Sequence, residues 1–125
     1  MQYKLLAIDL DGTLLDENKD ITSSTIKAIR KIKEDGVKVV IATGRMLVSA
    51  LTYVKKLNLE GPVITYNGAY VKDVSENKVI YHKPIDLNLA KNIIKDCQEE
   101  DLHINLYQDD RLYVREMNSS VKDYE

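Results

Sequence analysis

The sequence contains a single cysteine, Cys97, among its 125 residues. One cysteine excludes an intrachain disulfide framework and a zinc cluster built from cysteines. No apolar run approaches the roughly 20 residues that a membrane-spanning helix needs, and the apolar stretch after the charged start is too short for a secretory signal. We therefore predict a cytoplasmic protein with no membrane partner.

The chain also lacks a strong excess of charge of either sign. Its 18 Lys and Arg residues nearly balance its 20 Asp and Glu residues, and no block of basic residues is present. A phosphate backbone is normally bound by such a basic patch, so nucleic acid is not an expected partner. With 44% hydrophobic residues and the length of one ordinary domain, the chain is expected to fold.

Short apolar stretches alternate with amphipathic ones in the first half of the chain. The stretches Lys4–Leu10, Val37–Ala42 and Val63–Tyr66 predict strands, the first of them buried on both faces. Ile21–Asp35 and the segment 47–57 carry apolar side chains at helical spacing. This order predicts a parallel sheet with right-handed crossovers, and its ligands should lie beyond the carboxyl ends of the strands.

The second half of the chain has a different pattern. Residues 69–73 and 78–82 predict paired strands, and a helix capped by Asp86 is expected to run to about Glu100. Residues 103–108 and 112–117 alternate around Asp109-Asp110, which predicts a hairpin whose tip is explained by turn chemistry.

Two carboxylates two residues apart follow the first predicted strand, in the segment Asp9-Leu10-Asp11-Gly12-Thr13. They can converge on one ion if the chain turns sharply there, which Gly12 permits. Such close like charges repel unless they share a cation or a proton, and Mg²⁺ is commonly held by one or two carboxylates plus substrate phosphate. A bare Asp-x-Asp is more often an acidic strand end, but the glycine, the threonine and the buried strand favour a site.

A second polar segment, Ala42-Thr43-Gly44-Arg45, follows the second predicted strand. A hydroxyl, a glycine amide and the first turn of a following helix can together donate hydrogen bonds to a phosphate. Alternatively, Thr43 is an N-cap without a ligand. Because Asp9–Thr13 lies at the end of the neighbouring strand, phosphate binding is favoured over an N-cap without a ligand.

The segment Asp9–Thr13 resembles, residue by residue, the first motif of the haloacid dehalogenase (HAD) superfamily of phosphotransferases. Ala42–Arg45 combined with Asn67-Gly68-Ala69 is similar to the Cof-type sugar-phosphatase branch. The resemblance implies an α/β fold: an incomplete doubly wound (Rossmann-like) parallel sheet with the beginning of an α+β cap domain. Residues 1–82 would be the amino-terminal part of the core, and residues 83–125 the start of the cap.

The same resemblance implies a Mg²⁺-dependent phosphomonoester hydrolase acting on small phosphorylated metabolites, with sugar phosphates as one class. Asp9 would be the nucleophile that forms an aspartyl phosphate, and Asp11 the general acid and base. Asp9 through a carboxylate oxygen and Asp11 through its main-chain carbonyl would bind the metal. The remaining site residues would bind phosphate or line the substrate mouth: Gly12, Thr43, Gly44, Arg45 and Asn67.

Two later motifs of the family are missing from the sequence: a lysine that supports the phosphate charge, and a Gly-Asp-x-x-x-Asp segment that completes the metal site. We therefore expect a carboxyl-truncated chain that is weak or inactive alone. In the family's sheet the first strand is central, so residues 5–10 would form an exposed apolar edge here. That edge predicts self-association or strand exchange.

Two other functional hypotheses can be weighed against the same residues. One is a noncatalytic phosphate-binding or metal-binding fragment that acts through assembly with a partner. The other is a receiver-like phosphoacceptor, which shares a phosphorylatable aspartate at a strand end but normally assembles its acidic cluster from separate strands. Asp-x-Asp-Gly-Thr fits the receiver hypothesis poorly.

Overall fold

The computed structural model describes residues 3–116. The chain divides into two compact units, Met1–Lys83 and Pro84–Glu125. Assigning the first unit to a catalytic core and the second to a cap stays a prediction.

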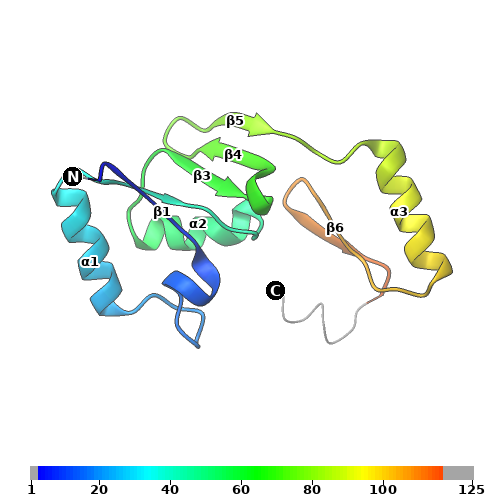
Figure 1. Cartoon of the computed structure of the whole chain (residues 1–125), viewed down its shortest axis with the longest axis horizontal. Helices are drawn as coiled ribbons and strands as arrows, with labels where there is room; N and C mark the ends of the chain where they lie inside the picture. Colours follow the sequence, from blue (N-terminus) through cyan, green and yellow to red (C-terminus); the bar gives the residue numbers. More distant parts are fainter. Residues whose placement is uncertain (1–2, 117–125) are drawn as a thin grey trace. The chain divides into compact units, whose positions relative to one another are not determined.

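The first unit contains each strand and helix predicted for it. In chain order these are β1 (Leu5–Ile8), η1 (Leu10–Leu14), α1 (Ser23–Glu34), β2 (Lys38–Ile41), α2 (Leu47–Lys56), β3 (Pro62–Thr65), η2 (Tyr66–Gly68), β4 (Tyr70–Asp73) and β5 (Lys78–His82) (Figure 1). Thr22 is the N-cap of α1, and its hydroxyl accepts a hydrogen bond from the Thr25 amide at 3.2 Å.

The expected parallel pairing is present but short. β1 and β2 pair in parallel, from Leu5 opposite Lys38 to Ile8 opposite Ile41. β2 meets β3 only through a parallel bridge between Ala42 and Ile64, whereas β3, β4 and β5 form an antiparallel sheet. The Ile64 carbonyl accepts a hydrogen bond from the Thr43 amide, so the main-chain groups of Ile64 face β2. The main chain of Pro62, two residues earlier, faces β2 as well, but proline has no N–H to donate. This missing donor limits the ladder between β2 and β3.

The hydrophobic core lies on one face of the β1–β2 pair. Alternate residues of these strands, such as Ile8 and Ile41, pack with side chains of both helices, among them Ile29 of α1 and Val54 of α2. Leu5 and Ala7, on the opposite face of β1, are exposed. The prediction that β1 is buried on both faces is therefore wrong, because both helices cover the same face.

The second unit contains α3 (Leu87–Glu99), β6 (Asn105–Gln108) and β7 (Arg111–Val114). Asp86 caps α3 as predicted, accepting hydrogen bonds from two amides of the first turn. β6 and β7 form the predicted antiparallel hairpin, and its tip residues Asp109 and Asp110 both have positive φ. The predicted end of the second hairpin strand, Met117, lies outside the described residues.

Of the helices formed by residues 3–116, none has the length and apolar character needed to cross a membrane.

Candidate active site

The chain turns sharply where β1 ends, and this turn separates the two predicted catalytic carboxylates. Asp9 is extended, and the next residues form a five-residue loop closed by a hydrogen bond from the Leu15 amide to the Leu10 carbonyl, 2.9 Å. Gly12 has φ +69°, a left-handed conformation that side chains with a Cβ rarely adopt. The left-handed backbone conformation of Gly12 is therefore consistent with the sharp turn by which the chain leaves the strand.

Gly12→Ala is expected to destabilise the fold by about 1–2 kcal/mol, which is the cost of a left-handed conformation for an L-residue with a Cβ. No atom lies within 4 Å of the added Cβ, so the loss arises from the backbone and not from a clash. Urea unfolding measures it. Gly12→Asn is the matched control and should lose less, because asparagine tolerates this conformation. Equal losses for alanine and asparagine would contradict the explanation.

Thr43 is buried at the end of β2, with 5% of its surface exposed. It is not a helix N-cap, because α2 begins three residues after Gly44 with Met46 as its N-cap residue. Instead, the Thr43 hydroxyl oxygen accepts a hydrogen bond from the Arg45 amide at 3.2 Å. The hydroxyl proton thus remains available to a ligand, which is the donor that a phosphate oxygen requires.

Asn67 lies in η2, directly after β3, and its side chain approaches Gly44. Tyr66 and Asn67 both have positive φ, and the Asn67 amide donates to the Thr43 carbonyl at 3.2 Å. A Cβ on Gly44 would lie 2.9 Å from the side-chain oxygen of Asn67, so only glycine leaves Asn67 in place. Consecutive residues in this conformation are uncommon and are typical of functional sites that the surrounding structure holds in place.

These residues meet in one open pocket of about 420 Å³. Four of the predicted site residues line it, namely Asp9, Thr43, Gly44 and Asn67, together with Ala42, Ile64 and Gly68. The Asp9 side chain is exposed and forms no hydrogen bond or ion pair with any residue in the described range 3–116. A carboxylate therefore faces an open space beside a buried hydroxyl donor. Asp11, Gly12 and Arg45 do not line this pocket.

Asp11 and Arg45 bind each other instead. Arg45 Nε lies 2.7 Å from Asp11 Oδ2, and Arg45 Nη2 lies 2.5 Å from Asp11 Oδ1, which is a bidentate ion pair. The hydrogen bonds from Arg45 hold the pKa of Asp11 below its ordinary value, and Asp11 in turn raises the pKa of Arg45. A proton donor near neutral pH needs a raised pKa, so the shift of the Asp11 pKa is opposite to the one that the predicted acid role would require.

Two residues of α2 support Arg45, and sequence reasoning missed both. Arg45 Nη1 lies 3.3 Å from Ser49 Oγ and 3.3 Å from Tyr53 Oη. The Tyr53 hydroxyl donates to the Lys19 carbonyl at 3.0 Å. Ser49 and Tyr53 are spaced four apart, which places them on one side of α2, and Arg45 precedes Ser49 by the same spacing, just ahead of the helix. That spacing was the available signal.

No group of three or more His, Cys, Asp or Glu side chains in the described part of the chain is arranged to hold a metal ion. Asp11 is engaged by Arg45, which leaves Asp9 as the carboxylate of this pocket without a charged partner. The atoms at this pocket that could bind a metal ion are therefore oxygen atoms, and they form only part of a metal site.

The sequence model of the haloacid dehalogenase-like hydrolase family matches residues 6–125. This chain belongs to that family. It is 34% identical over 100 residues to the 5-amino-6-(5-phospho-D-ribitylamino)uracil phosphatase YitU of Bacillus subtilis, covering 79% of this chain and 37% of that protein. It is 33% identical over 112 residues to the pyridoxal phosphate phosphatase YbhA of Escherichia coli, covering 90% of this chain and 41% of that protein.

Solved structures agree with this assignment. The HAD subclass IIB sugar phosphatase BT4131 superposes with a TM-score of 0.83 and 32% identity, over 96% of this chain and 46% of that one. The chain is thus of phosphatase lineage, in the Cof-type subclass, as its motifs predicted. It spans less than half the length of each of these three relatives.

Proposed function

We propose that the protein acts as a cytoplasmic, Mg²⁺-dependent phosphomonoester hydrolase on small phosphorylated metabolites, sugar phosphates among them. One observation carries this proposal: the unpaired carboxylate of Asp9 lines the same pocket as the buried Thr43 hydroxyl and Gly44. A nucleophile beside hydrogen-bond donors is the arrangement that phosphoryl transfer needs. The three relatives support the substrate class, since each is named as a phosphatase of a small metabolite or sugar.

In the proposed reaction, a carboxylate oxygen of Asp9 forms a bond to phosphorus while the bond from phosphorus to the leaving oxygen breaks. The leaving oxygen takes a proton from Asp11. Water then attacks the aspartyl phosphate, Asp11 takes a proton from that water, and inorganic phosphate leaves with Asp9 restored as a carboxylate. Thr43 Oγ and the Gly44 amide would donate hydrogen bonds to the phosphoryl oxygens.

Asp11 can perform this acid step only after it separates from Arg45. An ionised carboxylate in a bidentate ion pair has no proton to give, and its lowered pKa keeps it ionised. The arrangement in this structure is therefore a resting one for Asp11. Substrate phosphate is a competing anion for Arg45, so binding of substrate would provide a partner that releases Asp11.

Asp9 at the pocket and the backbone of the adjoining loop at Asp11 would provide a partial site for Mg²⁺. A carboxylate oxygen of Asp9 and the main-chain carbonyl of Asp11 are hard oxygen donors, and Mg²⁺ usually keeps several waters and binds substrate phosphate as well. When bound, the ion supplies positive charge that offsets the charge of the phosphoryl group and of the attacking carboxylate.

Mg²⁺ removal is expected to abolish phosphate release from a generic phosphomonoester, because Asp9 and the phosphate would then repel each other without a shared cation. The rate of phosphate release by the 125-residue chain is measured in three conditions: with Mg²⁺, after Mg²⁺ is removed by a chelator, and after excess Mg²⁺ is added back. We expect a slow, Mg²⁺-restored rate from this chain. Release that is unchanged by chelation would overturn the metal-dependent proposal.

A noncatalytic role through assembly is the second candidate, and two observations favour it. The chain spans only 37–46% of the three relatives, and in the described residues β1 pairs on one side only. In this case inorganic phosphate or Mg²⁺ would bind, as calorimetry can show, while no ester would be hydrolysed. Turnover that depends on Asp9 would exclude this candidate.

A further inference from the structure

The guanidinium group of Arg45 is held by α2 on one side and faces Asp11 on the other. Its Nη1 atom contacts Ser49 Oγ and Tyr53 Oη, each at 3.3 Å, while Nε and Nη2 form the edge that binds the Asp11 carboxylate. The Arg45 Cζ atom also lies 5.3 Å from the centre of the Tyr53 ring, which is within the range of a cation–π contact. Three contacts with α2 therefore fix the direction of the Nε–Nη2 edge.

Tyr53 is itself fixed in place, because it is buried and its hydroxyl has two partners. The hydroxyl accepts a hydrogen bond from Arg45 Nη1 and donates one to the Lys19 carbonyl at 3.0 Å. Lys56, three residues further along α2, forms an ion pair with Asp20. Residues 19 and 20 belong to the loop between η1 and α1, so α2 holds both this loop and the guanidinium group of Arg45.

The two partners of the Asp11–Arg45 ion pair differ in exposure. The side chain of Asp11 is 55% exposed, whereas that of Arg45 is 22% exposed. A rotation of the Asp11 side chain into water would therefore break the pair at little cost in packing, while Arg45 keeps its contacts with α2. The edge that Asp11 leaves has two parallel N–H donors, which suit a phosphate as well as a carboxylate. One anion can thus replace the other without movement of Arg45.

We propose that Tyr53 is a positioning residue for substrate binding, which holds Arg45 in place while the substrate phosphate replaces Asp11 on the Nε–Nη2 edge. This role rests on the proposed function, because the phosphate is that of its substrate. Tyr53 acts through Arg45, and its hydrogen bond to the Lys19 carbonyl continues to hold the loop when the Asp11 side chain moves. The released carboxyl group of Asp11 is then free to face the leaving oxygen.

Calorimetric titration of inorganic phosphate into the 125-residue chain, in the presence of Mg²⁺, tests the proposal. Tyr53→Phe keeps the buried ring but removes both hydrogen bonds of the hydroxyl, and should raise the dissociation constant about threefold to tenfold. Arg45→Gln should raise it at least about tenfold, because the phosphate loses a charged bidentate partner. Urea unfolding checks that each variant is folded at the temperature of the titration.

The double variant separates positioning from a general effect on the fold. When Arg45 is already replaced by Gln, Tyr53→Phe should cause no further loss of phosphate affinity, because Tyr53 acts through the guanidinium group. If Tyr53 only stabilised the fold around the pocket, its replacement would weaken phosphate binding by the same factor whether or not Arg45 is present.

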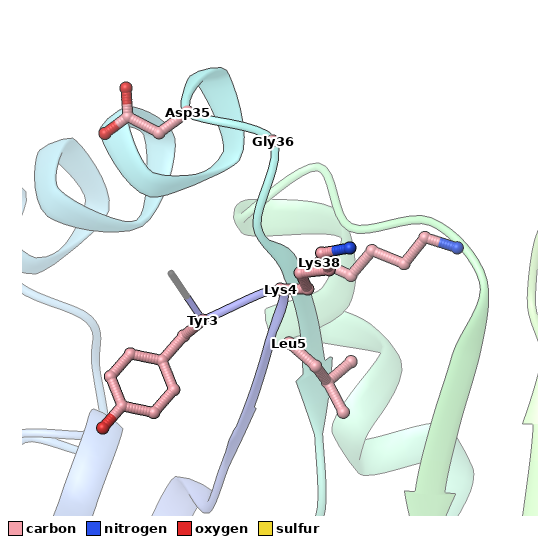
Figure 2. Close-up of a pocket in the computed structure, with 6 residues that line it drawn as sticks. All are labelled: Tyr3, Lys4, Leu5, Asp35, Gly36 and Lys38. Atoms are coloured by element: carbon pink, nitrogen blue, oxygen red, sulfur yellow. The ribbon is translucent and has the colours of Figure 1, made fainter. Parts of the chain in front are cut away.

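Lys38→Gln is the matched control for the loss of a positive charge. Lys4 and Lys38 line an open pocket of about 520 Å³ at the start of β1 and β2, where Figure 2 shows the ring of Tyr3 pointing away from both ammonium groups. Asp9 and Thr43 follow the other ends of these two strands. Lys38→Gln should therefore leave the dissociation constant of phosphate unchanged.

The outcomes distinguish failure of the positioning role from failure of the proposed function. Unchanged phosphate binding in Tyr53→Phe or in Arg45→Gln, equal losses from Tyr53→Phe with and without Arg45, or an equal loss in Lys38→Gln would each overturn the role of Tyr53 and leave the phosphate site standing. If the unaltered chain bound no phosphate, both the role of Tyr53 and the proposed phosphate site would be overturned.

Discussion

Asp9→Asn is expected to reduce Mg²⁺-dependent phosphoryl transfer by at least about 10³-fold, the scale seen when a catalytic nucleophile is removed. The amide has nearly the shape of the carboxylate but cannot attack phosphorus to form a stable acyl phosphate. Asp9 is exposed and has no partner within residues 3–116, so the substitution should leave the fold unchanged. The rate of phosphate release from a small ester measures the loss, and thermal unfolding checks the fold.

Asp109→Asn is the matched control for Asp9→Asn. Asp109 belongs to a pair of adjacent aspartates at the tip of the β6–β7 hairpin, where positive φ suits asparagine. Its replacement should leave phosphoryl transfer unchanged. Equal losses at Asp9 and Asp109, or full activity in Asp9→Asn, would contradict the assignment of the nucleophile.

Arg45→Gln is expected to raise the pKa of Asp11 toward its ordinary value of 3.8, because the hydrogen bonds and charge that lower it are removed. The sign of this pKa shift determines how the stability of the protein depends on pH. A carboxylate with a lowered pKa in the folded state stabilises the protein above its ordinary pKa, and this contribution is lost as pH falls through the folded-state value. The difference in unfolding free energy between the two proteins should therefore shrink as pH falls below 3.8.

Carboxyl-carbon NMR titration of Asp11 measures the pKa directly, and urea unfolding at neutral and acid pH measures the linkage. Ser49→Ala is the control, because it removes one hydrogen bond to Arg45 and leaves the pair with Asp11 in place. Its Asp11 titration should match that of the unaltered protein. An Asp11 that titrates at the same pH in Arg45→Gln would show that the ion pair does not form in solution.

Local sequence signals predicted the elements and much of the pocket. Asp86 caps α3 and Asp109-Asp110 forms a hairpin tip, because each depends on bonds within a few residues. Asp9, Thr43 and Asn67 converge because they follow neighbouring strands at the same end of a sheet. This part of the site is a consequence of topology.

Long-range side-chain contacts and partial pairing were not predictable in the same way. The partner of Asp11 is Arg45, 34 residues away, and only the conformation of the loop after β1 decides that the two meet. The exposed face of β1 depends on which elements cover the sheet, which the apolar run in the sequence does not encode. Pro62 was an unused signal of the short ladder between β2 and β3, because its missing N–H is a local property.

The most direct test identifies the atom that receives phosphorus. The chain is mixed with a reactive aryl phosphate and Mg²⁺, quenched in acid within a single turnover, and digested for peptide mass spectrometry. We predict one phosphoryl group, located on Asp9 and absent from Asp9→Asn. A phosphoryl group on any other residue, or equal labelling of the Asn variant, would contradict the assignment of Asp9 as the nucleophile.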